Sequence, residues 1–163
     1  MSEIVILFIL CRYDSTIYKI TKIMEEMFFA FLKPSLGTVS PAIKRLSNLG
    51  CIEIQDKMSD GGMLSKTCSI TPYGKKYLKE LLLGLEFLNP AHIISNVKIA
   101  LFCSSVLEGE DKEKFTNNIK NYLILHKGKI NEGLKNPYVE FNDMQKSMIE
   151  ASIKEADEIL AIL

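Results

Sequence analysis

The first half of the chain alternates between apolar stripes of helical spacing and short polar breaks. Residues 4–11 are apolar on nearly every side, which is typical of a short buried helix. Ser15 follows a polar break and is expected to cap a second helix, because its hydroxyl can accept a hydrogen bond from a free backbone N–H. A third helix is predicted from about Thr38 to Gly50, since apolar residues recur there at positions i, i+4 and i+7. Its expected buried face is Val39, Ile43 and Leu46.

After Gly50 the pattern changes from helical to alternating. Ile52 and Ile54 alternate with polar residues, as in a half-buried strand. The run Asp60-Gly61-Gly62 is a strong turn signal, and a second strand-like run follows at 66–70. The sequence therefore predicts a β-hairpin.

The second half is expected to be entirely helical. Thr71-Pro72 begins a helix with a cap and a proline at its first position, and Asn89-Pro90 breaks the pattern behind it. Three further helices are predicted, from about 91 to 107, 111 to 133 and 140 to the end. We predict a mainly α fold with a small β-hairpin, composed of a winged helix-turn-helix module at 1–86 and a helical dimerisation region at 87–163.

Net charge gives no indication of a partner, because 20 basic residues balance 20 acidic ones. Within Met27–Gly50, however, the only charged residues are Lys33, Lys44 and Arg45. If the apolar stripe of the third helix faces inward, its outward side chains are Ser40, Pro41, Lys44, Arg45 and Asn48. Thr38, at the amino end of this helix, is expected to offer its hydroxyl and a free N–H to a phosphate. A solvated surface without a ligand is the alternative interpretation of these charges.

The order of these elements favours DNA binding. In a winged helix-turn-helix the third helix enters the major groove, and the hairpin approaches the adjacent backbone. A basic outward face on that helix, followed at once by a glycine-tipped hairpin, fits this docking geometry.

Residues 35–46, SLGTVSPAIKRL, together with Gly50-Cys51-Ile52-Glu53, resemble the recognition-helix signature of PadR-type bacterial transcriptional regulators. That family usually reads Pro-x-x-Gly-Thr-hydrophobic-Tyr-Pro-x-Leu-x-Arg-Leu. Two flanking segments, 15–20 and 66–75, are also similar to the family, so the resemblance covers about residues 4–85. The DNA-binding residues expected from the pattern and the resemblance are Tyr18, Ser35, Thr38, Ser40, Pro41, Lys44, Arg45, Asn48, Gly61, Gly62 and Lys66.

The chain also departs from the family pattern. Ser40 stands where the family usually has a tyrosine that contacts phosphate, and residues 60–64 at the wing tip lack the common arginine. Because backbone contacts supply much of the affinity of such proteins, weaker or differently placed DNA contacts are expected. A winged-helix protein-interaction module that has lost DNA binding is therefore the second hypothesis.

The resemblance implies a homodimer joined by C-terminal helices, and the last predicted helix supports this. Its apolar residues repeat at spacings of 4, 3, 4 and 3 with a widened stripe, as in a helical contact surface. The residues expected at the dimer interface are Phe141, Met144, Met148, Ile149, Ile153, Ala156, Leu160 and Leu163. Packing of this helix within its own subunit is the alternative.

No catalytic motif is recognisable, so we do not expect an enzyme, a metal site or a cofactor. His92 and His126 are isolated, and the four cysteines lack metal-ligand spacing, so they are expected to be buried free thiols. The first apolar run is too short to cross a bilayer, which suggests a cytoplasmic protein. The expected partners are double-stranded operator DNA, a second copy of the chain and an unidentified small-molecule effector, with no membrane.

Overall fold

The computed structural model describes residues 1–58, 64–87 and 89–163, and these form two compact units. The first unit comprises residues 1–86 and 95–108, and the second comprises 87–94 and 109–163. The helix after residue 93 was expected to belong to the C-terminal region. Most of it instead packs with the N-terminal module.

The first unit is built around α1 (Ser2–Leu10), whose side chains from Ile4 to Leu10 are all buried. Strand β1 (Ser15–Thr16) follows, and then α2 (Ile17–Phe28). The expected cap was wrong by one residue, because the Thr16 hydroxyl accepts from the backbone N–H of Lys19 at 3.2 Å. Ser15 is the first residue of the strand, and its buried hydroxyl has no hydrogen-bond partner among the residues that the structure describes.

Helix α3 (Leu36–Asn48) has well-defined ends. Ser35 caps its start through a capping box with Thr38. At the other end Gly50 adopts φ +73°, and the N–H groups of Gly50 and Cys51 donate to the carbonyls of Ser47 and Leu46. This Schellman motif turns the chain directly into the sheet.

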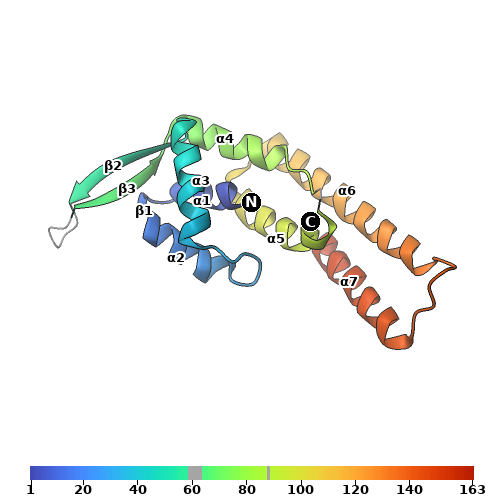
Figure 1. The fold of residues 1–163 in the computed structure, drawn as a ribbon. Coiled ribbons are helices and arrows are strands. Elements are labelled where there is room, and N and C mark those ends of the chain that lie inside the picture. Colours follow the sequence, from blue (N-terminus) through green and yellow to red (C-terminus); the bar gives the residue numbers. More distant parts are fainter. Residues whose placement is uncertain (59–63, 88) are drawn as a thin grey trace. The chain divides into compact units, whose positions relative to one another are not determined.

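The sheet has three antiparallel strands in the order β1-β3-β2. The predicted hairpin is confirmed as β2 (Ile52–Met58) paired with β3 (Leu64–Ile70), and β1 adds a short third strand to β3. Figure 1 shows the hairpin extending away from α3. The expected turn residues Asp60, Gly61 and Gly62 lie outside the described residues.

Helix α4 (Pro72–Leu83) begins as predicted, with Thr71 as its cap and Pro72 at its first position. The Thr71 hydroxyl accepts from the N–H of Gly74 at 2.9 Å and contacts the carbonyl oxygen of Gly50 at 2.7 Å. A Cβ atom at Gly74 would lie 2.1 Å from the carbonyl oxygen of Cys51. The absence of a side chain at Gly74 therefore lets α4 pack directly on the turn that follows α3.

Helix α5 (Ile93–Cys103) lies between two short 3-10 turns, Pro90–His92 and Ser104–Val106. The Phe102 ring makes edge-to-face contacts with Phe8 of α1 and Phe28 of α2, at centroid distances of 5.7 and 5.0 Å. These contacts explain why this part of the chain belongs to the first unit.

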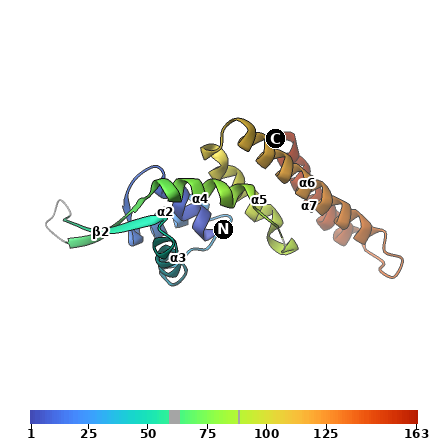
Figure 2. The same cartoon turned by 90° about the horizontal axis from the view of Figure 1, so that it is seen from above.

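The second unit contains α6 (Gly109–Leu134) and α7 (Asp143–Ala161), which lie side by side (Figures 1 and 2). Lys127 of α6 pairs with Asp157 of α7. Among the described residues, no helix is long and apolar enough to cross a membrane. The buried side chains of these two helices are Phe115, Ile119, Leu123, Ala156 and Ile159.

Candidate nucleic-acid interface

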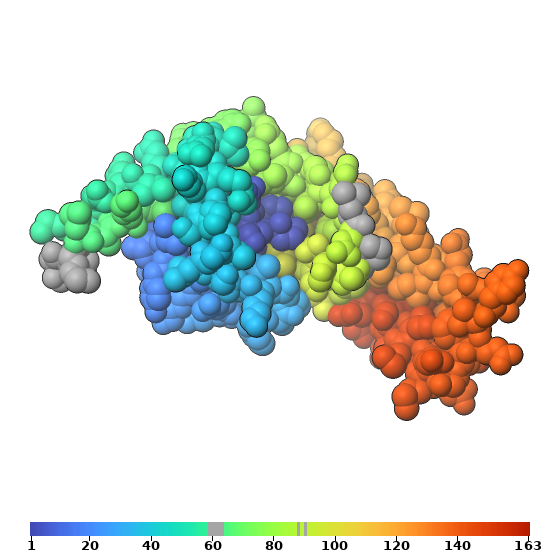
Figure 3. All heavy atoms as spheres, viewed as in Figure 1, coloured from blue at the N-terminus to red at the C-terminus, as the bar shows by residue number. Residues whose placement is uncertain are grey.

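Helix α3, the predicted recognition helix, presents the face that the sequence predicts. Its buried side chains are those of Val39, Ala42, Ile43 and Leu46. Successive residues of an α-helix are about 100° apart, so Pro41, Lys44 and Asn48 lie opposite this buried face, with Ser40 at one flank. All four are exposed, and α3 forms part of the surface seen in Figure 3.

Lys44 has no ion-pair partner among the residues described. Its positive charge is therefore free to attract a phosphate. Asn48 lies one helical turn further along, with an amide that can both donate and accept. This combination suits a surface that contacts phosphates through a cation and base edges through an amide.

Arg45 is engaged differently from Lys44. Its Nε and Nη2 atoms both lie 2.9 Å from Oε1 of Glu3, which belongs to α1. The arginine side chain is 60% exposed and the glutamate side chain 26%. Glu3 could not be identified as this partner from the sequence, because an acid 42 positions away leaves no local signal of pairing.

Thr38 was expected to offer its hydroxyl and a free N–H to a phosphate, and in the structure both groups make hydrogen bonds within the helix cap. The helix begins two residues earlier, and the Thr38 hydroxyl donates to the Ser35 carbonyl oxygen at 2.9 Å. The Thr38 N–H donates to the same carbonyl at 3.0 Å. The Ser35 N–H in turn donates to the Thr38 hydroxyl at 3.1 Å, so both residues serve first as the helix cap.

Tyr18 of α2 is 69% exposed and lies close to the beginning of α3. With Lys22, Ser35 and Leu36 it lines a groove of about 390 Å³. Tyr18 is therefore an exposed side chain beside the start of α3.

The hairpin carries two lysines, and each faces an acid. Lys57 Nζ lies 3.0 Å from Oδ2 of Asp14. Lys66, which is exposed, is the register partner of Asp56 on the neighbouring strand. Gly61 and Gly62, expected at the tip, lie outside the residues that the structure describes. The described part of the wing is therefore nearly neutral in charge.

Three of the four cysteines are buried, as predicted, and Cys11 is not. All four are free, and Cys51, Cys68 and Cys103 are buried, whereas Cys11 is half-buried. Burial raises the pKa of Cys103 to about 12, so its thiol stays protonated at neutral pH. Within the described residues, no three His, Cys, Asp or Glu side chains gather as metal ligands.

The residues expected at the dimer interface, in and around α7, differ in exposure and fall into three groups. Ala156 is fully buried within the second unit and is already covered by the chain's own residues. Met144 and Met148 are 75% and 68% exposed. The remaining members of the stripe are half-buried: Phe141, Ile149, Ile153, Leu160 and Leu163.

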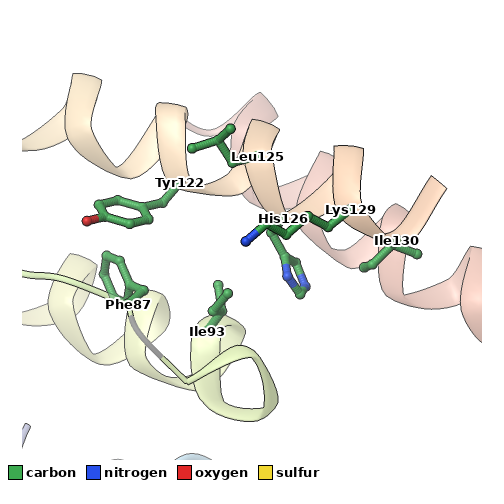
Figure 4. Close-up of a pocket in the computed structure, with 7 residues that line it drawn as sticks. All are labelled: Phe87, Ile93, Tyr122, Leu125, His126, Lys129 and Ile130. Carbon is green, nitrogen blue, oxygen red and sulfur yellow. The ribbon is translucent and has the colours of Figure 1, made fainter. Parts of the chain in front are cut away.

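The second unit also contains a pocket of about 350 Å³ (Figure 4). Phe87 and Tyr122 meet edge to face at 4.9 Å on one side, and the Lys129 side chain points into the space beside His126. Burial lowers the pKa of His126, and the charge of Lys129 lowers it further. The lining residues are Phe87, Ile93, Tyr122, Leu125, His126, Lys129 and Ile130.

The adjacent helices α2 and α3, followed by a paired hairpin, define a winged helix-turn-helix protein. Residues 6–80 match the model of the transcriptional regulator PadR-like family. The chain therefore carries a PadR-like domain, and the resemblance found in the sequence is confirmed for that segment.

Several solved structures are similar to this chain. A transcriptional regulator from Clostridium thermocellum is 27% identical over 48% of this chain and 75% of its own, with a TM-score of 0.43. Bacillus subtilis PadR in complex with operator DNA is 15% identical over 99% of this chain and 97% of its own, with a TM-score of 0.48. The protein smu.1604c from Streptococcus mutans is 21% identical over 98% and 94%, with a TM-score of 0.45. No curated protein matches the sequence significantly.

Proposed function

We propose that this chain is a PadR-type, sequence-specific DNA-binding repressor that acts as a homodimer in the cytoplasm. The observation that carries the proposal is the outward face of α3, where exposed Pro41 and Asn48 lie on either side of Lys44, a lysine without an ion-pair partner in the described chain. Such a helix supplies both a phosphate contact and a polar group for base edges. A dimer bound at a promoter would repress by occupying the DNA.

Salt dependence of binding tests the proposal. A DNA-binding protein loses affinity steeply as salt rises, because phosphate contacts release counterions. Lys44→Ala should lower the magnitude of the slope of log K against log salt by about 1. Lys146→Ala, which removes an exposed lysine from α7, is the matched control and should leave the slope unchanged. Salt-independent binding, or equal effects of the two variants, would refute DNA recognition through α3.

The second candidate is a winged-helix interaction module that has lost DNA binding. The observation that favours it is the pairing of basic residues with acids, because Arg45 meets Glu3 and Lys57 meets Asp14. A protein with this role would bind a protein partner and show no affinity for any duplex at low salt. The same titration therefore separates the two candidates.

The pocket of the second unit supports the proposal that a small-molecule effector modulates DNA binding. Its volume lies in the range of small-molecule sites, and its lining is mostly apolar with one ammonium group. A flat apolar molecule bearing an anionic group fits this chemistry, because Lys129 would pair with the charge. Anilinonaphthalene sulfonate is a suitable probe, and Lys129→Ala should weaken its binding about tenfold. Equal binding of the probe by the variant would exclude this site.

A further inference from the structure

The ion pair between Glu3 and Arg45 joins two helices that the sequence gives no reason to connect. Two guanidinium nitrogens of Arg45 converge on a single carboxylate oxygen of Glu3, each at 2.9 Å. The glutamate is the less exposed partner, so it forms the fixed side of the pair. The arginine side chain, which is more exposed, is the partner that can move.

The position of Arg45 on α3 explains how this pair bears on DNA binding. Arg45 lies on the flank of the outward face, whereas Lys44 and Asn48 lie near its centre. Helices α1 and α3 pack against each other, so this flank is the one beside Glu3. The long arginine stem would allow the guanidinium to reach either Glu3 or a phosphate of a duplex docked on α3.

The two possible partners of Arg45 compete for the same donors. A guanidinium binds a carboxylate and a phosphate through the same fork of N–H groups, and it cannot use that fork for both at once. Exposed ion pairs contribute little net stability, because water screens the attraction and the side chains lose freedom. Glu3 is therefore displaceable, yet its negative charge opposes the approach of DNA.

We propose that Glu3 is an affinity-setting residue, an internal carboxylate that competes with DNA phosphate for Arg45 and so limits the sequence-independent part of DNA binding. The inference rests on the DNA binding proposed above. It assigns Glu3 a positioning role, since the residue acts through Arg45 and does not itself contact DNA.

The test measures affinity for a fluorescently labelled, mixed-sequence duplex several helical turns long, over a range of salt concentrations. Glu3→Gln keeps the shape of the side chain and removes its charge, so it should tighten binding roughly threefold to tenfold at low salt. The magnitude of the slope of log K against log salt should rise by about 1, because Arg45 gains a phosphate contact. Glu3→Ala removes the acceptor as well and should show at least the same gain. Thermal unfolding of each variant confirms that it is folded.

The matched control is Glu80→Gln. Glu80 lies on α4 and pairs with Lys76 at 3.6 Å, so its loss changes the net charge equally without releasing Arg45. Glu80→Gln should leave the salt slope unchanged.

A double-mutant cycle with Arg45→Ala separates the proposed competition from a general field effect. The gain from Glu3→Gln should largely disappear when Arg45 is alanine. An equal gain in both backgrounds, or equal effects of Glu3→Gln and Glu80→Gln, overturns the proposal while DNA binding itself stands. Absence of salt-dependent binding by the unmodified protein, with Lys44→Ala silent, overturns the proposed function and this inference together.

Discussion

The ammonium group of Lys57 lies 3.0 Å from a carboxylate oxygen of Asp14 and thereby ties strand β2 to the residue that precedes β1. Both side chains are about half exposed. Such a pair adds little to stability, on the order of 0–1 kcal/mol. Its main consequence is electrostatic, because a lysine already neutralised by an acid attracts phosphate less strongly.

The two lysines of the wing should differ in DNA binding, because Lys57 forms an ion pair with Asp14 at 3.0 Å, whereas Lys66 only stands opposite Asp56 in the strand register. Lys66→Ala should weaken binding equally for an operator-containing and a random duplex, because a phosphate contact carries no sequence information. Lys57→Ala should have the smaller effect, since Asp14 already pairs with that lysine. Affinities of both variants for the two duplexes, measured at two salt concentrations, show which substitution weakens binding more. A larger loss from Lys57→Ala would show that the pair opens when DNA binds.

Substitutions of Lys44 and Asn48 should have different effects, the first on affinity for any DNA and the second on sequence specificity. Lys44→Ala should weaken binding to all sequences by a similar factor, whereas Asn48→Ala should cost about 1–3 kcal/mol on the operator and relax discrimination. Gel-shift titrations with operator and mutated duplexes measure both quantities. If Asn48→Ala weakens operator and random duplexes alike, Asn48 contacts the backbone and does not read bases.

The helix order, the hairpin and the outward face of α3 could be predicted from the sequence, because each depends on local periodicity and turn chemistry. The stripe of Val39, Ile43 and Leu46 fixed which side of α3 faces outward, and the structure confirms it. The cap at Thr16 was missed because Ser15 and Thr16 are adjacent and both can cap, and only the pairing of Ser15 with Cys68 places Ser15 in a strand.

The ion-pair partners of the charged side chains could not be predicted, because these partners are distant in sequence. Glu3 and Arg45 are 42 residues apart, and Asp14 and Lys57 are 43 apart. Surface pairs of this kind follow from how α1 packs on α3 and on the sheet, which the hydrophobic pattern does not encode. The grouping of α5 with the first unit was missed for the same reason, since it depends on contacts of Phe102 with Phe8 and Phe28.

Gly74 should be among the least replaceable residues of the first unit. In Gly74→Ala the new Cβ would lie 2.1 Å from the Cys51 carbonyl oxygen and 2.8 Å from Cγ1 of Ile70. Both neighbours belong to the turn and strand that α4 packs against, so relief requires a backbone shift. We expect a loss of about 3 kcal/mol or more in the free energy of unfolding, measured by urea denaturation.

Gly37→Ala is the control for that variant. Its nearest neighbour, Oγ of Ser35, would be 3.7 Å away, and alanine favours the helix. The control should stabilise the protein by up to about 1 kcal/mol. Equal stability of the two variants would mean that α4 can separate from the turn at little cost.

The exposed methionines of α7 provide the sharpest test of dimerisation. Deleting α7 would also uncover the α6 side chains that it buries, so a point substitution is the cleaner experiment. Met148 is largely exposed in the single chain, so Met148→Glu should leave each subunit folded while placing a charge in the proposed apolar contact. We expect the dimer dissociation constant to rise about tenfold or more, measured by sedimentation. Lys154→Glu changes an exposed lysine of the same helix that lies about 100° or more around the axis from both Met148 and Ile153, so it should leave the dimer dissociation constant unchanged. A Met148→Glu protein that still sediments as a dimer would place the subunit contact elsewhere than on this face of α7.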